Sequence, residues 1–279
     1  MQNLFALFGF EFFQNAFLAA LMASITCGII GTYIVSRRIV FISGGITHAS
    51  FGGIGMGYYF GFNPIAGAIA FGILSALGIE LFTKKADLRE DSAIAMLWSL
   101  GMALGIIFIF LTPGYAPNLM SYLFGNILTV SKSDLLFLLF LSVFVIGFFL
   151  VFYRMIIFVS FDEEFALTNN APVRLFNALL ISLVALTIVL NIRVVGIILV
   201  MSLLTIPQAI ANLFTKRFDV MMFYSIAFAF LGSVAGLAFS YIYDIPSGAA
   251  IIFTLVVLYG IFKILFLSFG KANMGTVRK

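Results

Sequence analysis

The sequence predicts an all-α integral membrane protein, a polytopic bundle of about 8–9 transmembrane helices with its N-terminus outside and its C-terminus in the cytoplasm. Hydrophobic residues make up 63% of the 279 residues and charged residues only 9%, with a mean hydropathy of +1.20. A soluble domain carries roughly 25% charged residues. The apolar runs are continuous rather than alternating, which favours helices over a β-barrel.

Nine apolar segments form a single transmembrane domain, 1–279, and glycine- or proline-rich turns separate several of them. The segments lie at about 13–36, 40–62, 64–83, 92–112, 134–153, 174–192, 194–214, 220–242 and 247–269. A shorter apolar piece, 119–130, is too short to cross a bilayer. We expect it to be a re-entrant or surface helix.

The distribution of basic residues predicts the orientation. With the N-terminus outside, all of the 15 Lys and Arg residues except Lys132 and Arg193 fall on the cytoplasmic side. The inverted topology would reverse this ratio, against the tendency of Lys and Arg to collect in cytoplasmic loops. The same tendency accounts for the net charge of +4, so no nucleic-acid partner is predicted.

Several function classes lack their sequence motifs. A single cysteine, Cys27, excludes an intrachain disulfide and a CxxC metal site. The chain has no GxxxxGK[ST] motif, so it does not bind ATP through a P-loop, and it has no HExxH motif. An intramembrane enzyme with one histidine and so few acids is not expected.

The segment ISGGITHASFGGIGMGYYFG, residues 42–61, contains His48, the only histidine of the chain. A helix that starts near Arg38 would place His48 about 15 Å deeper, near the middle of the hydrocarbon core. A polar group at this depth is a functional candidate by default. The alternative is a buried histidine that bonds a carbonyl of a neighbouring helix.

Two sets of glycines surround His48, and helical spacing separates them. We expect the first set to share the face of His48 and to leave open backbone beside the imidazole: Gly44, Gly52 and Gly55. The second set has GxxxGxxxG spacing on the opposite face, where a neighbouring helix can approach closely: Gly53, Gly57 and Gly61.

Neutral imidazole is a common ligand for zinc, copper, iron and nickel. One histidine cannot make a tight site, because structural zinc takes four protein ligands and catalytic zinc usually three. Sparse ligands suit passage of an ion better than storage or catalysis. The stripes of Met and Phe elsewhere in the chain are interpreted as packing or lipid-facing residues.

Two further features concern moving parts. Pro207 lies inside an apolar segment and must disturb its helix, because proline lacks an N–H and clashes with the carbonyl of Leu203. The longest charged loop, about 155–173, contains Asp162, Glu163 and Glu164 and is cytoplasmic in the preferred topology. It is either a solvated connector or a docking helix for a cytoplasmic partner.

Six segments in order resemble one family over nearly the whole chain, the permease subunits of bacterial ABC importers for zinc, manganese and iron. They are SRRIVFISGGITHASFGGIGMGYYFG, REDSAIAMLWSLGMALGIIFI, SYLFGNILTVSKSDL, FDEEFALTNNAPVRLFN, VVGIILVMSLLTIPQAIANLFTKR and YDIPSGAAIIF. His48 falls on the pathway histidine of the family. The family pattern often has an aspartate four residues earlier, where this chain has Gly44, and the glycine usual near the end of the coupling loop is replaced around Asn169–Ala171.

The resemblance implies a homodimer in the bacterial inner membrane, with the pathway along the dimer axis. It implies cytoplasmic ATPase subunits that dock on the coupling loop, Asp162–Ala171, which includes Phe165 and Ala166. An extracytoplasmic metal-binding protein would deliver the ion. Zinc is favoured over manganese or iron, since the carboxylate is lost and the imidazole is kept. No permanently bound cofactor is expected.

Two other transport functions remain open at this stage. The chain could be a secondary carrier that works alone on an ion gradient, or an ABC permease for a metal chelate such as a siderophore. The missing ATP site favours an ABC permease, because a partner chain would then hydrolyse ATP.

Overall fold

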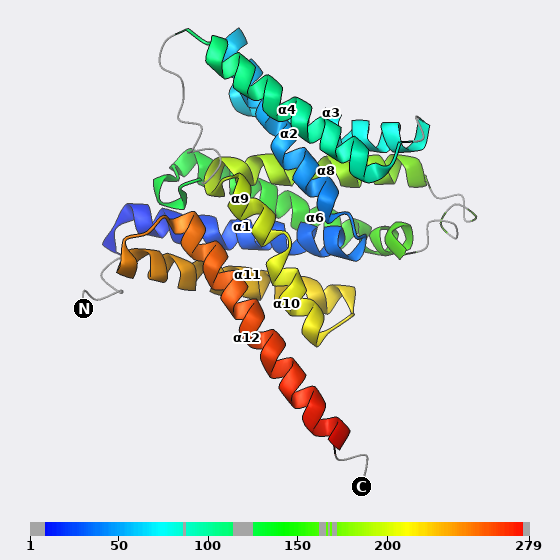
Figure 1. Cartoon of the computed structure of the whole chain (residues 1–279), viewed down its shortest axis with the longest axis vertical. Coiled ribbons are helices and arrows are strands. Elements are labelled where there is room, and N and C mark those ends of the chain that lie inside the picture. The colour runs from blue at the N-terminus through cyan, green and yellow to red at the C-terminus, as the bar shows by residue number, and fades with distance from the viewer. Residues whose placement is uncertain are drawn as a thin grey trace.

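The structure is a computed structural model that describes residues 9–85, 88–113, 125–161, 166, 168 and 172–275. These residues form helices and no strands (Figure 1). The helices are α1 (Glu11–Ser36), α2 (Val40–Phe60), α3 (Pro64–Lys85), α4 (Glu90–Leu111), the 3-10 helix η2 (Ile127–Thr129), α6 (Lys132–Phe161), α8 (Val173–Val195), α9 (Ile197–Leu203), α10 (Ile206–Phe214), α11 (Phe218–Tyr243) and α12 (Ser247–Gly275).

Eight segments of the described chain are long and apolar enough to cross a membrane. They correspond to α1, α3, α4, α6, α8, the pair α9–α10, α11 and α12. The 21-residue helix α2 has the required length but is not one of the eight, because glycines and hydroxyl side chains interrupt its apolar residues. The prediction of an all-α bundle with about 8–9 membrane-length helices is therefore confirmed.

Two ion pairs join α1, α6 and α8 at the end of the bundle where α1 begins. Lys132 Nζ lies 2.7 Å from Glu11 Oε1, and Arg193 Nε lies 2.7 Å from Asp134 Oδ1. The two basic residues that the preferred topology leaves outside are thus both at this end. We call it the α1-start end.

The segment after Gly125 stays at the α1-start end. Gly125 has φ +62° and packs so closely on the backbone at Val195 that a Cβ would overlap it. Ile127 of η2 is buried, and the Asn15 amide donates to the Val130 carbonyl at 3.4 Å. The described part of the predicted 119–130 piece, residues 125–130, is therefore a short turn around η2 that packs against this end of the bundle. Residues 119–124 lie outside the described residues.

The opposite end is where α1 and α6 finish. The Arg37 guanidinium donates to the carbonyls of Val159 and Ser160 at 2.8 and 3.3 Å. Helix α6 is longer than its predicted span, 134–153, and continues to Phe161 after a kink at Phe152 (φ −103°, ψ 15°). Residues 155–161, which were predicted to belong to the coupling loop, are therefore part of helix α6.

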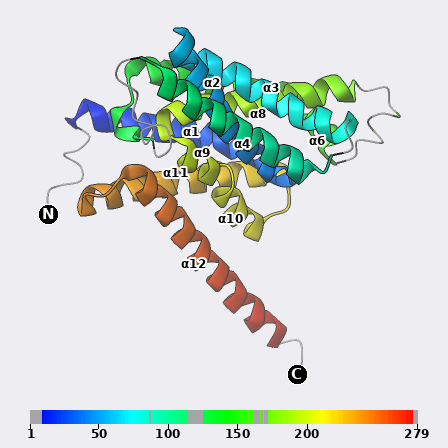
Figure 2. The ribbon, with the colours of Figure 1, turned by 45° about the horizontal axis from the view of Figure 1, so that its top comes forward.

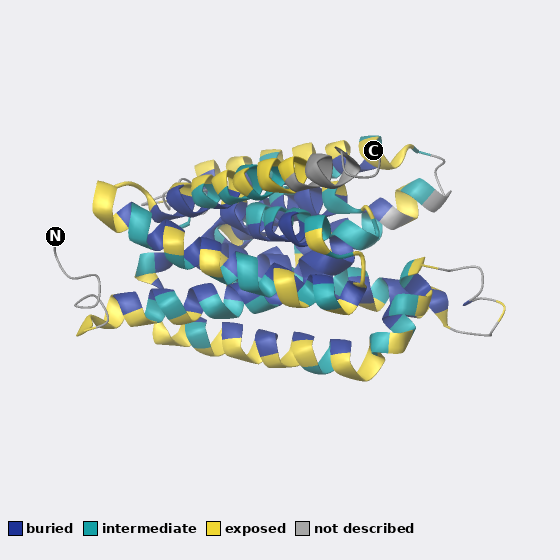
Figure 3. Cartoon of the chain, turned by 90° about the horizontal axis from the view of Figure 1, so that it is seen from below, coloured by how far each residue is buried: buried dark blue, intermediate teal, exposed yellow. Residues whose placement is uncertain are grey.

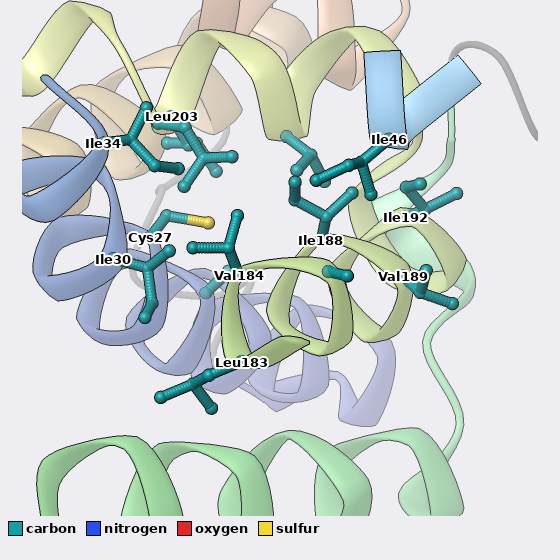
Figure 4. Packing of buried hydrophobic residues seen from close by; sticks show 14 of the residues in the cluster. Cys27, Ile30, Ile34, Ile46, Leu183, Val184, Ile188, Val189, Ile192 and Leu203 are labelled. Carbon is teal, nitrogen blue, oxygen red and sulfur yellow. The ribbon is translucent and has the colours of Figure 1, made fainter. Parts of the chain in front are cut away.

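The core is centred on α8, which packs against α1, α2, α3, α6 and α9. Figure 4 shows Cys27 of α1 facing Val184 of α8, and Ile46 of α2 lying near Ile188. All four side chains are at most 2% exposed. The surface of the bundle is different, since exposed residues cover its outer helices (Figure 3). This arrangement is expected where lipid, which is itself apolar, surrounds the protein.

Most buried polar side chains of the bundle bond a carbonyl of their own helix, and a few also join two helices. The Asn191 amide donates to the Thr187 carbonyl of its own helix at 2.8 Å and to Thr26 Oγ1 at 3.2 Å, and the second bond links α8 to α1. Thr32 Oγ1 lies 3.3 Å from Ser225 Oγ and links α1 to α11. Such bonds between membrane helices contribute roughly 0.6 kcal/mol each on average.

Helix α12 leaves the bundle at an angle, and its C-terminal half extends beyond the other helices (Figure 2). Only 17% of its most apolar stretch is buried. Its first half packs against α11, where a Cβ on Gly236 would lie 2.8 Å from a side-chain carbon of Ile251. In Figure 1 the described part of α12 ends on the side of the bundle away from the α1-start end.

Candidate functional site

Helix α2 carries the candidate site and lies between α3 and α4, with α8 and α9 also in contact. The pair Gly44–Gly45 does not interrupt it, and the helix is continuous from Val40 to Phe60. Between Ile42 and Gly57 every residue is buried except His48 and Met56. The imidazole is therefore one of few groups on this helix that is open to its surroundings.

The glycines predicted for helix packing divide into two groups. Gly53 and Gly57 face α3, as their spacing predicts. A Cβ on Gly53 would overlap the Gly67 carbonyl, and one on Gly57 would lie 2.5 Å from Pro64 Cα. Gly61 has no heavy atom within 4 Å of an added Cβ; it ends α2 in the left-handed conformation with φ +74°. Its prediction as a packing residue is therefore wrong, and its role is that of a helix C-cap.

The expectation that Gly52 and Gly55 leave open backbone beside His48 is also wrong. A Cβ on Gly52 would lie 2.9 Å from the Gly101 carbonyl oxygen, and one on Gly55 would lie 2.5 Å from that of Gly105. Gly101 and Gly105 form a GxxxG pair on α4, which covers this side of α2. The error arose because the spacing identifies a face of a helix but not the neighbour that occupies it.

His48 lies against Trp98 of α4. The two rings are stacked, with centroids 4.0 Å apart and an angle of 9° between their planes. The Trp98 side chain is 36% exposed, so the stacked pair lies near the surface of the single chain. His48 Nδ1 is buried and has no hydrogen-bond partner among the described residues. The sequence left open that His48 bonds a carbonyl of a neighbouring helix. Its Nδ1 atom makes no such bond among the described residues.

Gly44 is one helical turn before His48, and a methionine occupies the space beside it. A Cβ on Gly44 would lie 3.1 Å from Met201 Cε and 3.5 Å from Trp98 Cζ3. Thr47 Oγ1 lies 3.6 Å from Met201 Sδ. Of Gly44, Gly52 and Gly55, only Gly44 lies against Trp98, the ring on which His48 stacks.

Pro207 divides its segment, as predicted. The segment 194–214 is not one helix: α9 ends at Leu203, Thr205 has φ −130° and ψ −49°, and Pro207 lies in the first turn of α10. A second break precedes α9 at Gly196, with φ +84° and ψ 163°. Both ends of α9 are therefore non-helical, and α9 carries Met201.

Gln208 stabilises the break at Thr205. Its amide nitrogen donates to the Cys27 carbonyl at 2.9 Å and to the Leu203 carbonyl at 3.2 Å. Gln208 is fully buried, and a Cβ on Gly31 of α1 would overlap its amide. The carbonyl that a proline leaves without its N–H partner is thus satisfied by the next side chain.

Most of the predicted coupling-loop residues lie outside the described residues: Asp162, Glu163, Glu164 and Phe165. Ala166 is described, is helical and is 1% exposed. Its burial in the hydrophobic core shows that at least this point of the loop packs against the bundle.

The described residues contain no group of three His, Cys, Asp or Glu side chains that could hold a metal ion. The site instead offers one imidazole, one thioether and one aromatic face. Neutral ligands in this number hold a cation weakly, which suits passage rather than storage. The fold defines a class, that of multi-pass α-helical membrane proteins.

Comparison with known proteins gives the family. A model of the ABC 3 transport family matches residues 9–266. A probable metal transport system membrane protein of Chlamydia pneumoniae is 43% identical, over 84% of this chain and 82% of its own length. The manganese transport system membrane protein MntC of Halalkalibacterium halodurans is 35% identical, over 91% of this chain and 87% of its own.

A solved structure agrees with these relatives. A chain of PsaBC from Streptococcus pneumoniae, in complex with Fab, superposes with a TM-score of 0.82 at 31% identity, covering 91% of each chain. The chain described here belongs to the ABC 3 transport family. It is therefore a multi-pass inner-membrane component of a transporter and not an enzyme.

Sequence reasoning missed Trp98 and Met201 as neighbours of the site. Trp98 is the only tryptophan of the chain, and this rarity was the available signal. Met201 offered no such signal, because methionine is common in apolar helices. In sequence it is separated from His48 by more than half the length of the chain. Its place beside Gly44 depends on how α9 packs on α2.

Proposed function

We propose that this chain is the permease subunit of an ATP-driven importer of divalent metal ions, with zinc favoured over manganese or iron. Family membership and the names of the relatives support metal transport. The observation that carries the proposal is His48. It is the single histidine, lies at the middle of α2, and keeps a buried ring nitrogen without a hydrogen-bond partner among the described residues.

The preference for zinc rests on the missing carboxylate. Manganese is best held by carboxylate, carbonyl and water oxygens, whereas imidazole suits zinc. Gly44 supplies no side chain at the position where a carboxylate one turn before His48 would stand. The manganese relative is the main argument on the other side, so the metal has to be measured.

We propose a homodimer with the ion path between its two copies. His48 and the partly exposed Trp98 lie near the surface of the single chain, so a second copy would close the site from the other side. Gly44 would shape this path by leaving room beside it. Pro207 would shape it by breaking the segment that contains α9 and α10.

The other partners follow from the topology. We place the α1-start end outside, because Lys132 and Arg193 there are both neutralised by acidic partners. An extracytoplasmic metal-binding protein would then dock at that end. ATPase subunits would dock on Asp162–Ala171 at the opposite end, and their closure would move α6 and α8, which flank this loop. No permanently bound cofactor is required.

The test is metal uptake into proteoliposomes that contain the chain with its ATPase and binding protein. For the intact protein we expect ATP-dependent zinc uptake. His48→Ala should reduce it by about ten-fold or more, as expected for loss of a metal ligand. Ser50→Ala is the matched control, because Ser50 is on the same helix but bonds the Ile46 carbonyl at 2.7 Å and faces Gly72 of α3.

Each outcome decides one part of the proposal. Unchanged uptake by His48→Ala would make His48 a packing residue, although the transporter would stand. Uptake that persists without the ATPase would favour a secondary carrier. Uptake of a metal chelate but of no free ion, independent of His48, would favour a chelate permease.

A further inference from the structure

The space beside Gly44 is filled by a sulfur-containing side chain that the sequence did not connect with the site. A Cβ on Gly44 would lie 3.1 Å from Met201 Cε, 3.5 Å from Trp98 Cζ3 and 3.8 Å from Met201 Sδ. Trp98 is also the ring on which His48 stacks. Met201 and His48 therefore border the same small region of α2, at adjacent turns.

The sulfur of Met201 keeps at least one of its two lone pairs free. The neighbouring hydroxyl, Thr47 Oγ1, lies 3.6 Å from Sδ but only 2.5 Å from the Ser43 carbonyl oxygen. A threonine hydroxyl has one proton to donate, and the shorter contact to Ser43 uses it. No other hydrogen bond to this sulfur is present among the described residues, so the thioether is available to a ligand.

The backbone of Met201 is held in place although both ends of α9 are broken. The Met201 carbonyl accepts a hydrogen bond from Thr205 Oγ1 at 2.8 Å, at the break before α10. Val200 and Leu203 on either side of it are buried in the core. Methionine is otherwise a flexible side chain, and this anchoring limits its movement to the side-chain torsions.

We propose that Met201 determines metal specificity, its thioether acting with His48 to favour zinc over manganese. This inference rests on the proposed function. Thioether and imidazole are soft or borderline ligands that suit zinc, whereas manganese requires hard oxygen ligands. The chain thus places a neutral sulfur next to Gly44, which supplies no carboxylate. A thioether ligand in place of a carboxylate changes which cation the site accepts.

The first measurement is independent of transport. The full chain in lipid nanodiscs is labelled with a methionine-selective oxaziridine, and labelling of each methionine is followed by peptide mass spectrometry. Zinc should slow the labelling of Met201 about ten-fold, and manganese should have little effect. The protection should disappear in His48→Ala. Met222, a partly buried methionine on α11, is the internal control and should label equally with either metal.

The second measurement is the ratio of zinc to manganese uptake in the complete transporter. Met201→Leu, which conserves volume and should fold, is expected to lower this ratio about ten-fold. Met222→Leu is the matched control and should leave it unchanged. Gly44→Asp returns a carboxylate at the cost of a small shift of the flexible Met201 end, and should raise manganese uptake.

The outcomes separate this inference from the function on which it rests. Suppose that the intact chain moves zinc or manganese, but zinc does not slow the labelling of Met201 and Met201→Leu leaves the uptake ratio unchanged. Met201 is then a packing residue, and the inference is wrong. If zinc protects Met201 in nanodiscs while the transporter moves neither metal, the binding site stands and the proposed function is overturned.

Discussion

Helices α2 and α12 are both long enough to cross a membrane, yet they are built for opposite surroundings. From Ile42 to Gly57, α2 is buried except at His48 and Met56, and its glycines meet backbone atoms of α3 and α4. Helix α12 is more apolar and mostly exposed, and Gly260 within it has no heavy atom within 4 Å of an added Cβ. The less apolar helix is thus the inner one.

This comparison shows that the more apolar helix of a membrane protein is not necessarily the more buried one. Lipid is as apolar as a leucine side chain, so large apolar residues gain little by facing another helix. Small residues allow backbones to approach, and this close packing orders a helix that also carries polar groups. A functional residue is therefore better sought on the glycine-rich inner helix than on the apolar outer ones.

The largest expected effect breaks the packing of α2. Gly55→Leu forces a side chain into the Gly105 carbonyl, which would lie 2.5 Å from the new Cβ, whereas Gly260→Leu adds the same side chain to α12 in open space. We expect Gly55→Leu to cost more than about 3 kcal/mol and to prevent recovery of folded protein. Thermal unfolding of the solubilised variants, followed by size-exclusion chromatography, measures the difference. Equal stability of the two variants would contradict the close packing of α2 on α4.

A second, smaller effect compares one substitution on the two helices. Ile46 of α2 is fully buried, and Ile264 of α12 is 66% exposed. Ile46→Ala leaves a cavity in the core and should cost about 2–5 kcal/mol, while Ile264→Ala should change stability by less than about 0.5 kcal/mol. The same thermal assay reports both. A large loss at Ile264 would indicate that this face of α12 is covered by another protein surface rather than by lipid.

The smallest effect should be shared by both helices. Ser50 of α2 donates to the Ile46 carbonyl at 2.7 Å, and Thr254 of α12 donates to the Ala250 carbonyl at 2.8 Å. Each bond lies within its own helix, so Ser50→Ala and Thr254→Val should each cost less than about 1 kcal/mol. Calorimetric unfolding of the variants in nanodiscs tests this. A much larger loss for Ser50→Ala would mean that its hydroxyl joins α2 to another helix.

Much of the fold could be predicted because hydrophobicity and turn chemistry are local properties. The ends of α1, α2, α3 and α11 were predicted to within a few residues. The break near Pro207 was also foreseen, since proline removes an N–H wherever a helix contains it. The break at Gly196 was not predicted, because a glycine inside an apolar run is compatible with a continuous helix.

The site was predicted in part. His48 was singled out by its rarity and depth, and the face of α2 with Gly53 and Gly57 was assigned to close packing, where α3 lies. The face with Gly52 and Gly55 was expected to be open, but α4 covers it with a GxxxG pair of its own. Periodicity places residues on a face, and it contains no information about the element that meets that face.

By itself the sequence determined the class of the protein, a range of about 8–9 long apolar segments and the single imidazole within one of them. These follow from composition and from spacing along one helix, which are fixed before any helix meets another. Only the tertiary structure decided that Trp98 stacks on His48 and that Met201 fills the space beside Gly44. Such neighbours come from distant parts of the chain and are chosen by the packing of whole helices, in which shape outweighs local preference.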